Sequence, residues 1–358
     1  MSGSTRRPCG ASWVAEALTM TFADRLVAAW YAPRLTPLAA ALTPFAALFS
    51  VGAAARRALF RIGLFTSQRV AVPVIVVGNI TVGGSGKTPL VAALATELSA
   101  RGWRPGIVSR GYGRDEAKAP LLVTGTTPAA LAGDEPVLLA RAGFPVAVDA
   151  DRVAAARALL AAHPSCDVLI ADDGLQHLRI ARDIEVAVVD GARGLGNGWR
   201  LPAGPLREAA SRLASVDAVV VLGDRAKEVP AWPTGAFAMT LEGETLHRVN
   251  APDVAATIER FREGRVHALA GIGNPQRFFD QLAALGVRAV AHPFPDHHRF
   301  RPDDLAIADA TAILMTEKDA VKCAAFADDR CWYLPVRARV DPALYRRIEE
   351  KLRGPQAA

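Results

Sequence analysis

The sequence predicts an α/β protein whose body is two doubly wound α/β/α lobes, joined by a β-hairpin linker and preceded by an apolar N-terminal helix. Short apolar runs alternate with helical patterns from Val72 onward, which is typical of βαβ units and a mostly parallel sheet. The alternation resumes after the linker, and a long uncharged stretch precedes the first strand. We therefore expect an N-terminal extension with its helix, a first lobe, a two-stranded linker and a second lobe, at residues 1–60, 61–234, 235–250 and 251–358.

Composition and charge limit the class of protein. With 358 residues, of which 51% are hydrophobic and 22% charged, the chain can bury a core in each of two domains. Its four cysteines are scattered without a C-x-x-C pair, which indicates a reduced, cytosolic setting. The net charge of +6 lies wholly in residues 1–70, because the rest balances 34 basic against 34 acidic residues. A nucleic acid partner is therefore not expected.

The N-terminal segment is both apolar and basic. Residues 35–55 are 21 consecutive uncharged residues, and three arginines follow closely, Arg56, Arg57 and Arg61. Apolar side chains recur at helical spacing, at Leu38, Leu42, Phe45 and Phe49. The prolines and alanines of this stretch argue against a helix that spans the membrane. The pattern favours a helix that lies in the membrane–water interface, with its arginines near anionic headgroups. An ordinary core helix is the alternative. We expect no cleavable signal peptide in residues 1–19, since Glu16 interrupts their apolar part.

The first lobe begins with its clearest elements. The strand "VPVIVVGN" at 72–79 is followed by a helix from about Pro89 to Arg101, where a proline in the first turn is tolerated. Five more apolar runs predict strands, at 105–111, 144–150, 166–173, 184–191 and 217–224.

The linker and the second lobe follow. "GAFAMTLEGETLHRVN" contains two short alternating runs around Gly243, which predict a hairpin. Residues 265–286 then read as a strand, a glycine turn and a helix, and further strands are predicted within 310–323 and 331–340.

The stretch "VGNITVGGSGKTPL" predicts a phosphate-binding loop between the first strand and its helix. The pattern G-x-x-x-x-G-K-[ST] fits at its end but has Thr81 in place of its first glycine. Gly83 and Gly84 supply the backbone freedom that the turn requires. Backbone amides and the lysine of such a loop bind phosphates, and its threonine ligates Mg²⁺. We therefore expect a P-loop nucleotide-binding lobe rather than a chance glycine-rich turn, with contacts from Thr81, Val82, Gly83, Gly84, Ser85, Gly86, Lys87 and Thr88.

Paired carboxylates end a later strand, "VLIADDGLQH", at Asp172 and Asp173. In phosphoryl-transfer enzymes a carboxylate on a neighbouring strand holds the Mg²⁺ that bridges the β and γ phosphates. Aspartates at the end of a strand also commonly cap the next helix, so the pair indicates a metal site only in combination with the phosphate loop. Together the two motifs predict a site for ATP and Mg²⁺.

Two further motifs offer a group that could accept the proton of an attacking hydroxyl. "GDEP" contains Asp134, and "FPDHHRF" places His297 and His298 after an aspartate in the second lobe. A carboxylate paired with an imidazole would be a competent base, although a solvated loop is the default for each motif alone. "SRGYGR" adds Arg110 and Arg114, which are suited to clamp phosphate.

Seven motifs in this order resemble the tetraacyldisaccharide 4'-kinase family of lipid A biosynthesis: "VGNITVGGSGKTPLV", "SRGYGR", "GDEPVLLA", "ADDGLQH", "LPAGPLRE", "FPDHHRF" and "TEKDAVK". The resemblance covers about residues 20–350, and this family also carries a threonine at the start of its loop octet. It implies ATP-dependent phosphorylation of the 4' hydroxyl of a tetraacylated glucosamine disaccharide 1-phosphate, which gives lipid IVA. It also implies catalysis in a cleft between two α/β lobes.

The resemblance assigns roles to individual residues. It implies that Asp134 is the base and His297 its partner in a dyad, while Lys87 and Thr88 contact phosphate and magnesium. The acidic residues near the metal would be Asp172, Asp173 and Glu208.

The expected partners follow from the substrate. An acylated sugar cannot leave the bilayer cheaply, since each exposed CH₂ costs about 0.8 kcal/mol. The enzyme would therefore meet its membrane lipid substrate at the anionic cytoplasmic face of the bacterial inner membrane, as a peripheral or monotopic protein. No obligate protein partner is evident in the sequence.

Other function classes remain as alternatives. A P-loop GTPase or metallochaperone-type NTPase would use hydrolysis as a switch. Such proteins read guanine with [NT]-K-x-D, and the nearest stretch here, Thr316 to Asp319, has its lysine one place late. A membrane-bound binding protein without catalysis is disfavoured because loop, acidic pair and candidate base are all present.

Overall fold

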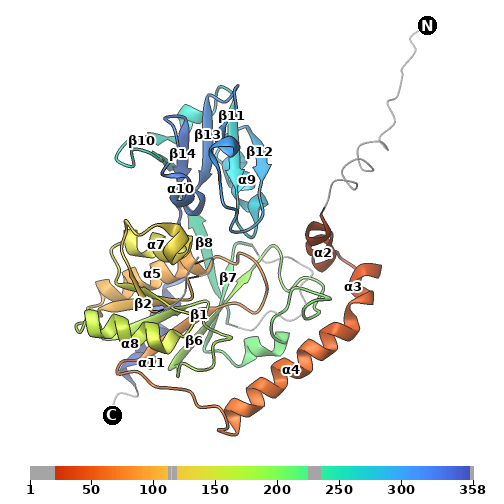
Figure 1. Cartoon of the computed structure of the whole chain (residues 1–358), viewed down its shortest axis with the longest axis vertical. Coiled ribbons are helices and arrows are strands. Elements are labelled where there is room, and N and C mark those ends of the chain that lie inside the picture. The colour runs from red at the N-terminus through yellow and green to blue at the C-terminus, as the bar shows by residue number, and fades with distance from the viewer. Residues whose placement is uncertain (1–20, 112–113, 115–118, 225–234, 355–358) are drawn as a thin grey trace.

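The computed structural model describes residues 21–111, 114, 119–224 and 235–354, and the expectation for residues 1–19 lies outside them. Two α/β lobes lie one above the other, with helices α2, α3 and α4 to the side (Figure 1). Each lobe is built on its own sheet, with nine strands in the first and six in the second among the described residues. The predicted α/β class with two lobes is confirmed.

The nine-stranded sheet has the order β15-β8-β7-β6-β1-β5-β2-β4-β3, and only the β3–β4 and β8–β15 pairs are antiparallel. Its strands are β1 (Val74–Gly78), β2 (Pro105–Ser109), β3 (Leu121–Val123), β4 (Val146–Val148), β5 (Val168–Asp172), β6 (Ile184–Asp190), β7 (Ala218–Leu222), β8 (Phe237–Glu242) and β15 (Arg337–Val340). The six strands predicted in the first lobe correspond to β1, β2, β4, β5, β6 and β7.

Helices cover both faces of this sheet. The helical elements of the lobe are α5 (Lys87–Ala100), α6 (Ala129–Ala132), α7 (Asp134–Arg141), α8 (Arg152–Ala162), α11 (Pro342–Arg353) and the 3-10 helix η1 (Ala210–Ala214). Apolar residues of α5, α7 and α11 form one core with β1, β5 and β6, and α8 belongs to the core on the other face.

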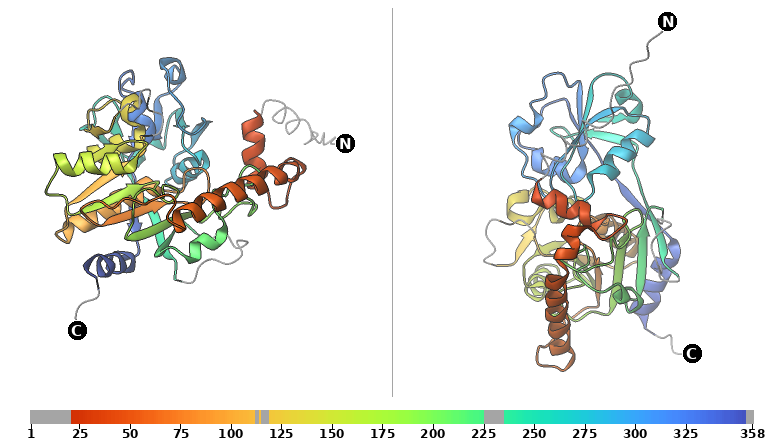
Figure 2. Two further views of the ribbon diagram at one scale, coloured as in Figure 1. Left: turned by 60° about the horizontal axis from the view of Figure 1, so that its bottom comes forward. Right: turned by 90° about the vertical axis from the view of Figure 1, so that its right-hand side faces the viewer.

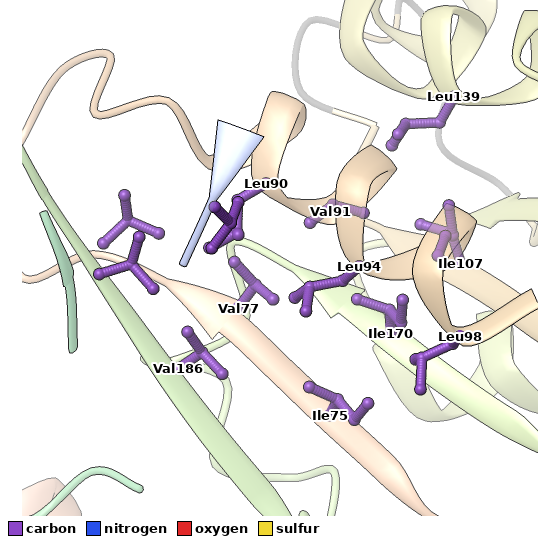
Figure 3. Close-up of a cluster of buried hydrophobic side chains, with 14 of the residues drawn as sticks. Ile75, Val77, Leu90, Val91, Leu94, Leu98, Ile107, Leu139, Ile170 and Val186 are labelled. Atoms are coloured by element: carbon purple, nitrogen blue, oxygen red, sulfur yellow. The ribbon is translucent and has the colours of Figure 1, made fainter. Parts of the chain in front are cut away.

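The helix α5 fixes the position of the loop that precedes it. Leu90, Leu94 and Leu98 are fully or almost fully buried, and they point toward the β-strand side chains in Figure 3. Full burial of such a side chain stabilises the fold by about 1.5–3 kcal/mol. The start of α5 is therefore held rigidly against the carboxyl end of β1.

The linker differs from the predicted hairpin. β8 pairs with β7 and β15 in the first sheet, whereas β9 (Thr245–Arg248) pairs with β10 and β14 in the second. The lobes are thus joined by two antiparallel crossings, one outward through β8 and β9 and one returning through β14 and β15. A Cβ on Gly243 would overlap the carbonyl oxygen of Pro335, so this glycine marks where the two crossings touch.

The returning crossing also corrects the expected extent of the second lobe. β15 and α11 belong to the first lobe, although both lie within residues 251–358. The apolar residues Leu344 and Ile348 of α11 are buried there beside the strands. These elements therefore join a sheet whose other strands lie almost 100 residues or more earlier in the chain.

The second sheet has the order β10-β9-β14-β13-β11-β12. Its remaining elements are β10 (Ala255–Thr257), β11 (Val266–Ala270), β12 (Ala289–Pro293), β13 (Ala312–Thr316), β14 (Cys331–Leu334), α9 (Pro275–Ala284), α10 (Glu317–Cys323) and the 3-10 helices η2 (Ile258–Phe261) and η3 (Pro302–Leu305). The glycine turn predicted after the first strand of this lobe is the β11–α9 connection, which faces the first lobe.

From residue 21 onward, the described part of the N-terminal segment contains the helices α2 (Phe22–Trp30), α3 (Pro37–Ala41) and α4 (Thr43–Arg61). The predicted apolar stripe is shared between α3 and α4, because the chain turns at Leu42. α4 runs along the outside of the first lobe, away from the second (Figures 1 and 2). Among the residues that the structure describes, no helix is long and apolar enough to cross a membrane.

Exposed apolar side chains gather on this N-terminal segment. Ten of the fifteen large hydrophobic side chains that are exposed in the described chain lie between residues 22 and 65. Phe45 and Leu48 of α4 are 60% and 71% exposed. Such a concentration on one segment indicates a contact surface rather than scattered surface residues.

Candidate active site

The predicted phosphate loop lies at the centre of the first sheet. It connects β1 to α5, and β1 is flanked by the parallel strands β5 and β6. The carboxyl ends of all three strands therefore open at the same edge, which is where ligands bind in doubly wound α/β folds. Gly83 and Gly86 have φ of +101° and +83°, so the loop uses its glycines for left-handed backbone.

The missing first glycine has a structural explanation. Thr81 forms an isolated antiparallel bridge with Leu206, and the amide of Val82 donates to the carbonyl of Pro205 at 2.8 Å. The backbone of Thr81 is thus extended and paired, a conformation that any residue adopts. A threonine is therefore compatible with the start of the loop, because the backbone of the segment "LPAGPLRE" pairs with it.

Asp172 is the most deeply placed charged group of the site. It ends β5 directly beside Val77 of β1 and is completely buried. Neither carboxylate oxygen has a hydrogen-bond partner within the described part of the chain. Burial, helped by the charges of Glu135 and Asp173, raises the pKa of Asp172 to about 7. An unpaired buried carboxylate beside a phosphate loop fits a Mg²⁺ ligand.

Asp173 has a different environment. Its backbone has φ of +48°, which is uncommon outside glycine. Its carboxylate lies 3.7 Å from Nζ of Lys87 and 3.1 Å from Nη1 of Arg207. Although burial raises the pKa of Asp173, the charges of Lys87 and Arg207 outweigh it and bring the pKa below its ordinary value. Asp173 therefore holds the loop lysine in place.

Glu208 does not join the other acidic residues. Its Oε2 lies 2.7 Å from Nη1 of Arg57 on α4, and its Oε1 accepts a hydrogen bond of 2.7 Å from Gln176. Across the described ranges, no three acidic, histidine or cysteine side chains converge in a way that could hold a metal. Both oxygens are occupied by protein donors, so the structure gives Glu208 the role of anchoring α4 and does not support the expected metal contact.

The expected dyad is formed across the lobes. Asp134 begins α7 in the first lobe, directly after Gly133, and is 6% exposed. Its Oδ2 lies 3.3 Å from Nδ1 of His297, which comes from the loop after β12 in the second lobe. His297 has φ of +60°. Among the described residues other than glycine, only Asp173 and His297 have a positive φ, and both belong to this site.

The two partners shift each other's pKa in opposite directions. Burial raises the pKa of Asp134, but the hydrogen bond to His297 and the charges of Lys318 and Lys322 bring it down to about 2. Burial lowers the pKa of His297, whereas Asp134 more than compensates and raises it above its ordinary value. The pair is an ionised carboxylate that orients an imidazole able to take up a proton.

The lobes also meet directly at the phosphate loop. A Cβ on Gly273, in the turn between β11 and α9, would overlap the backbone nitrogen of Gly84. Arg193 donates to the carbonyl of Gly273 at 2.6 Å, and Arg277 of α9 forms an ion pair with Asp190 at the end of β6. The second lobe therefore covers the loop with a backbone contact that requires a glycine at position 273, whereas a Cβ on Gly84 would come no closer than 3.4 Å to the facing backbone.

Several of these residues were missed by the sequence analysis. Asp190 ends a predicted strand, as Asp172 does, and this position was the available signal. Lys318 and Lys322 lie in the motif "TEKDAVK", and Lys318 also lies in the stretch compared with a guanine-reading motif, but the sequence assigned neither lysine a place beside Asp134. Of the two arginines proposed as phosphate clamps, Arg114 donates to the carbonyl of Val148 at 3.1 Å and so braces its own loop, while Arg110 is exposed just beyond β2.

Comparison with known proteins identifies the family. A family model described as LpxK, tetraacyldisaccharide-1-P 4'-kinase, matches residues 38–353. The tetraacyldisaccharide 4'-kinase of Azoarcus sp. is 54% identical over 317 residues, covering 88% of this chain and 92% of that protein. The protein of the same name from Chromobacterium violaceum is 51% identical over 332 residues, covering 90% and 96%.

A solved structure agrees with the sequence comparison. It is LpxK from Aquifex aeolicus, described as an "apo" form in complex with ATP. The sequences are 29% identical, the TM-score is 0.72, and the match covers 88% of this chain and 99% of that one. The chain therefore belongs to the tetraacyldisaccharide-1-P 4'-kinase family.

Proposed function

We propose that this protein transfers the γ-phosphate of ATP to the 4' hydroxyl of a tetraacylated glucosamine disaccharide 1-phosphate, giving lipid IVA. The observation that carries the proposal is the Asp134–His297 pair, which the two lobes assemble beside a phosphate loop. A switch NTPase needs no buried base assembled from a second lobe, so this observation disfavours the alternative. The names of the relatives and the ATP complex of the Aquifex aeolicus protein support the same conclusion.

The loop holds the donor. Its backbone amides and the N-terminus of α5 bind the phosphates, and Lys87 reaches the β and γ phosphates from the first position of that helix. Thr88 and Asp172, with Asp173 close by, would hold Mg²⁺, which supplies neutralisation of the charge on the phosphates. Asp173 also holds Lys87 in position, so the lysine is already placed at the loop before the nucleotide binds.

The dyad serves the acceptor. The 4' oxygen forms a bond to the γ-phosphorus, the bond from that phosphorus to the β–γ bridging oxygen breaks, and ADP leaves. The proton of the hydroxyl passes to the Asp134–His297 pair, whose imidazole is oriented by the carboxylate. The first lobe thus supplies the phosphate loop and Asp134, and the second lobe completes the base with His297.

The substrate sets the location that we propose. Its acyl chains stay in the bilayer, so the enzyme works at the cytoplasmic face of the inner membrane as a peripheral or monotopic protein. The exposed apolar side chains of α4 and its exposed arginines, Arg56 and Arg61, fit an anionic lipid surface. We expect neither a nucleic acid nor an obligate protein partner in this reaction.

A labelled phosphate transfer assay tests the proposal. We expect label from γ-labelled ATP in the disaccharide lipid, little label with GTP as donor, and little release of free phosphate when the lipid is replaced by buffer. Release of phosphate without lipid labelling would support the NTPase alternative and reject the kinase.

A further inference from the structure

The helix α10 brings two lysines to the interface between the lobes. Lys318 and Lys322 are one helical turn apart, on the face of α10 that packs against α7. Their Nζ atoms lie 3.9 and 3.8 Å from Oδ2 of Asp134, and this same oxygen is 3.3 Å from Nδ1 of His297. Three groups of the second lobe thus converge on one carboxylate oxygen of the first.

We propose that Lys318 and Lys322 are positioning residues that keep the Asp134–His297 pair free of protons, and thereby ready to receive the proton of the acceptor hydroxyl. This inference rests on the proposed function, because it concerns the base of that reaction. Neither lysine needs to touch the substrate to act in this way.

Charge is the means by which the lysines act. After burial and the His297 hydrogen bond, the charge of Lys318 is the next influence on the pKa of Asp134, and Lys322 adds to it. The charge of Lys318 also lowers the pKa of His297 and so opposes the effect of Asp134. Without the lysines, the pair would retain a proton at higher pH, because a positive neighbour disfavours protonation.

Neighbouring carboxylates hold the lysines in place. Nζ of Lys318 lies 3.0 Å from Glu135 and 3.3 Å from Asp296, and Nζ of Lys322 lies 2.6 Å from Asp319. The side chains of the lysines are only 14% and 11% exposed. Among the described residues, the charged and titratable groups whose ion pairs are recorded around the dyad include Glu135, Asp296, Asp319, Lys318 and Lys322.

The start of α10 explains why the lysines are aimed at this point. Thr316 caps the helix by accepting a hydrogen bond of 3.1 Å from the amide of Asp319. The fully buried Asp319 in turn accepts a hydrogen bond of 2.9 Å from the amide of Gly271, directly after β11. The helix is thus fixed to the second sheet, and "TEKDAVK" is accounted for as a device that presents Lys318 and Lys322 to the first lobe.

The pH dependence of the full-length enzyme tests this role. In Lys318→Met and Lys322→Met we expect the acid limb of kcat/KM to move to higher pH by about one unit, with the KM for ATP unchanged. Lys318→Arg keeps the charge and should leave the limb in place. The matched control is Lys351→Met, which removes a lysine from α11 where it pairs with Asp217.

A second readout does not depend on turnover. The ring resonances of His297, assigned by their loss in His297→Gln, should titrate at higher pH in Lys318→Met, whose charge lowers the pKa of His297 directly. In Lys322→Met the shift should have the same sign, because this lysine lies beside the Asp134 oxygen that faces His297. Melting curves identify which variants are folded, and either one suffices. An unmoved acid limb and an unmoved His297 titration in a folded methionine variant would overturn the inference. A wild-type enzyme that transfers no phosphate to the lipid would instead reject the proposed function.

Discussion

Lys87 and Asp134 serve opposite ends of the transferred phosphate, so their loss should separate binding from chemistry. Lys87→Ala removes the cation that reaches the β and γ phosphates and should weaken ATP binding as well as turnover. Asp134→Asn should lower kcat by roughly 10²- to 10⁴-fold, the usual contribution of a general base, while ATP binds normally. Nucleotide titration beside steady-state kinetics measures both, with Arg69→Ala as a control at an exposed ion pair. Near-normal turnover of Asp134→Asn at neutral pH would show that another group is the base.

His297 combines an unusual backbone with a chemical role, and two substitutions can tell them apart. Its φ of +60° suits asparagine but costs a β-branched residue about 1–2 kcal/mol. We expect His297→Asn and His297→Val to lose activity alike, because both lack the imidazole. Only His297→Val should also lower the melting temperature. Equal melting temperatures would mean that the surrounding loop does not hold this conformation.

Local patterns predicted the elements that have a signature of their own in the sequence. The β1–loop–α5 unit and the acidic end of β5 could be read from the sequence because buried strands and glycine turns have local signatures. The partner of β8 could not be predicted, since β15 lies almost 100 residues further along and only packing selects it. The pairing of Asp134 with His297 was expected from family resemblance, whereas the lysines beside them depend on how α10 meets α7.

The glycine turn between β11 and α9 offers a test of how closely the lobes must meet. In Gly273→Ala the added methyl group would clash with the backbone of Gly84, so the lobes should be held apart. We expect kcat to fall at least tenfold, because the dyad is assembled from both lobes. The matched control is Gly52→Ala in α4, where a Cβ meets nothing within 4 Å and helix propensity improves. Steady-state turnover measures kcat in both variants, and small-angle scattering measures the separation of the lobes. An unchanged kcat in Gly273→Ala would mean that the contact is dispensable.

The N-terminal helices are connected to the catalytic centre by a continuous set of polar contacts. Arg57 of α4 binds Glu208, and the adjacent Arg207 binds Asp173, which holds Lys87. A second connection runs from the end of α2, where the hydroxyl of Tyr31 donates to the carbonyl of Val82 at 3.3 Å. Removal of the whole segment would disturb the phosphate loop together with any membrane contact. The surface must therefore be tested by changes that leave these contacts intact.

Serine substitutions on the exposed face of α4 meet this requirement. Phe45, Leu48 and Phe49 are exposed and make no polar contact with the body, so Phe45→Ser, Leu48→Ser and Phe49→Ser should leave the melting temperature unchanged. If these side chains insert into lipid, each contributes up to about 1.5–3 kcal/mol, and the triple variant should bind anionic vesicles at least tenfold more weakly. Activity on acceptor lipid in vesicles should fall in parallel, while activity on detergent-dispersed lipid should persist. The control is Leu122→Ser with Val290→Ser, which alters exposed apolar residues on β3 and β12. Equal vesicle binding by the triple variant and the wild type would place the membrane contact elsewhere on the protein.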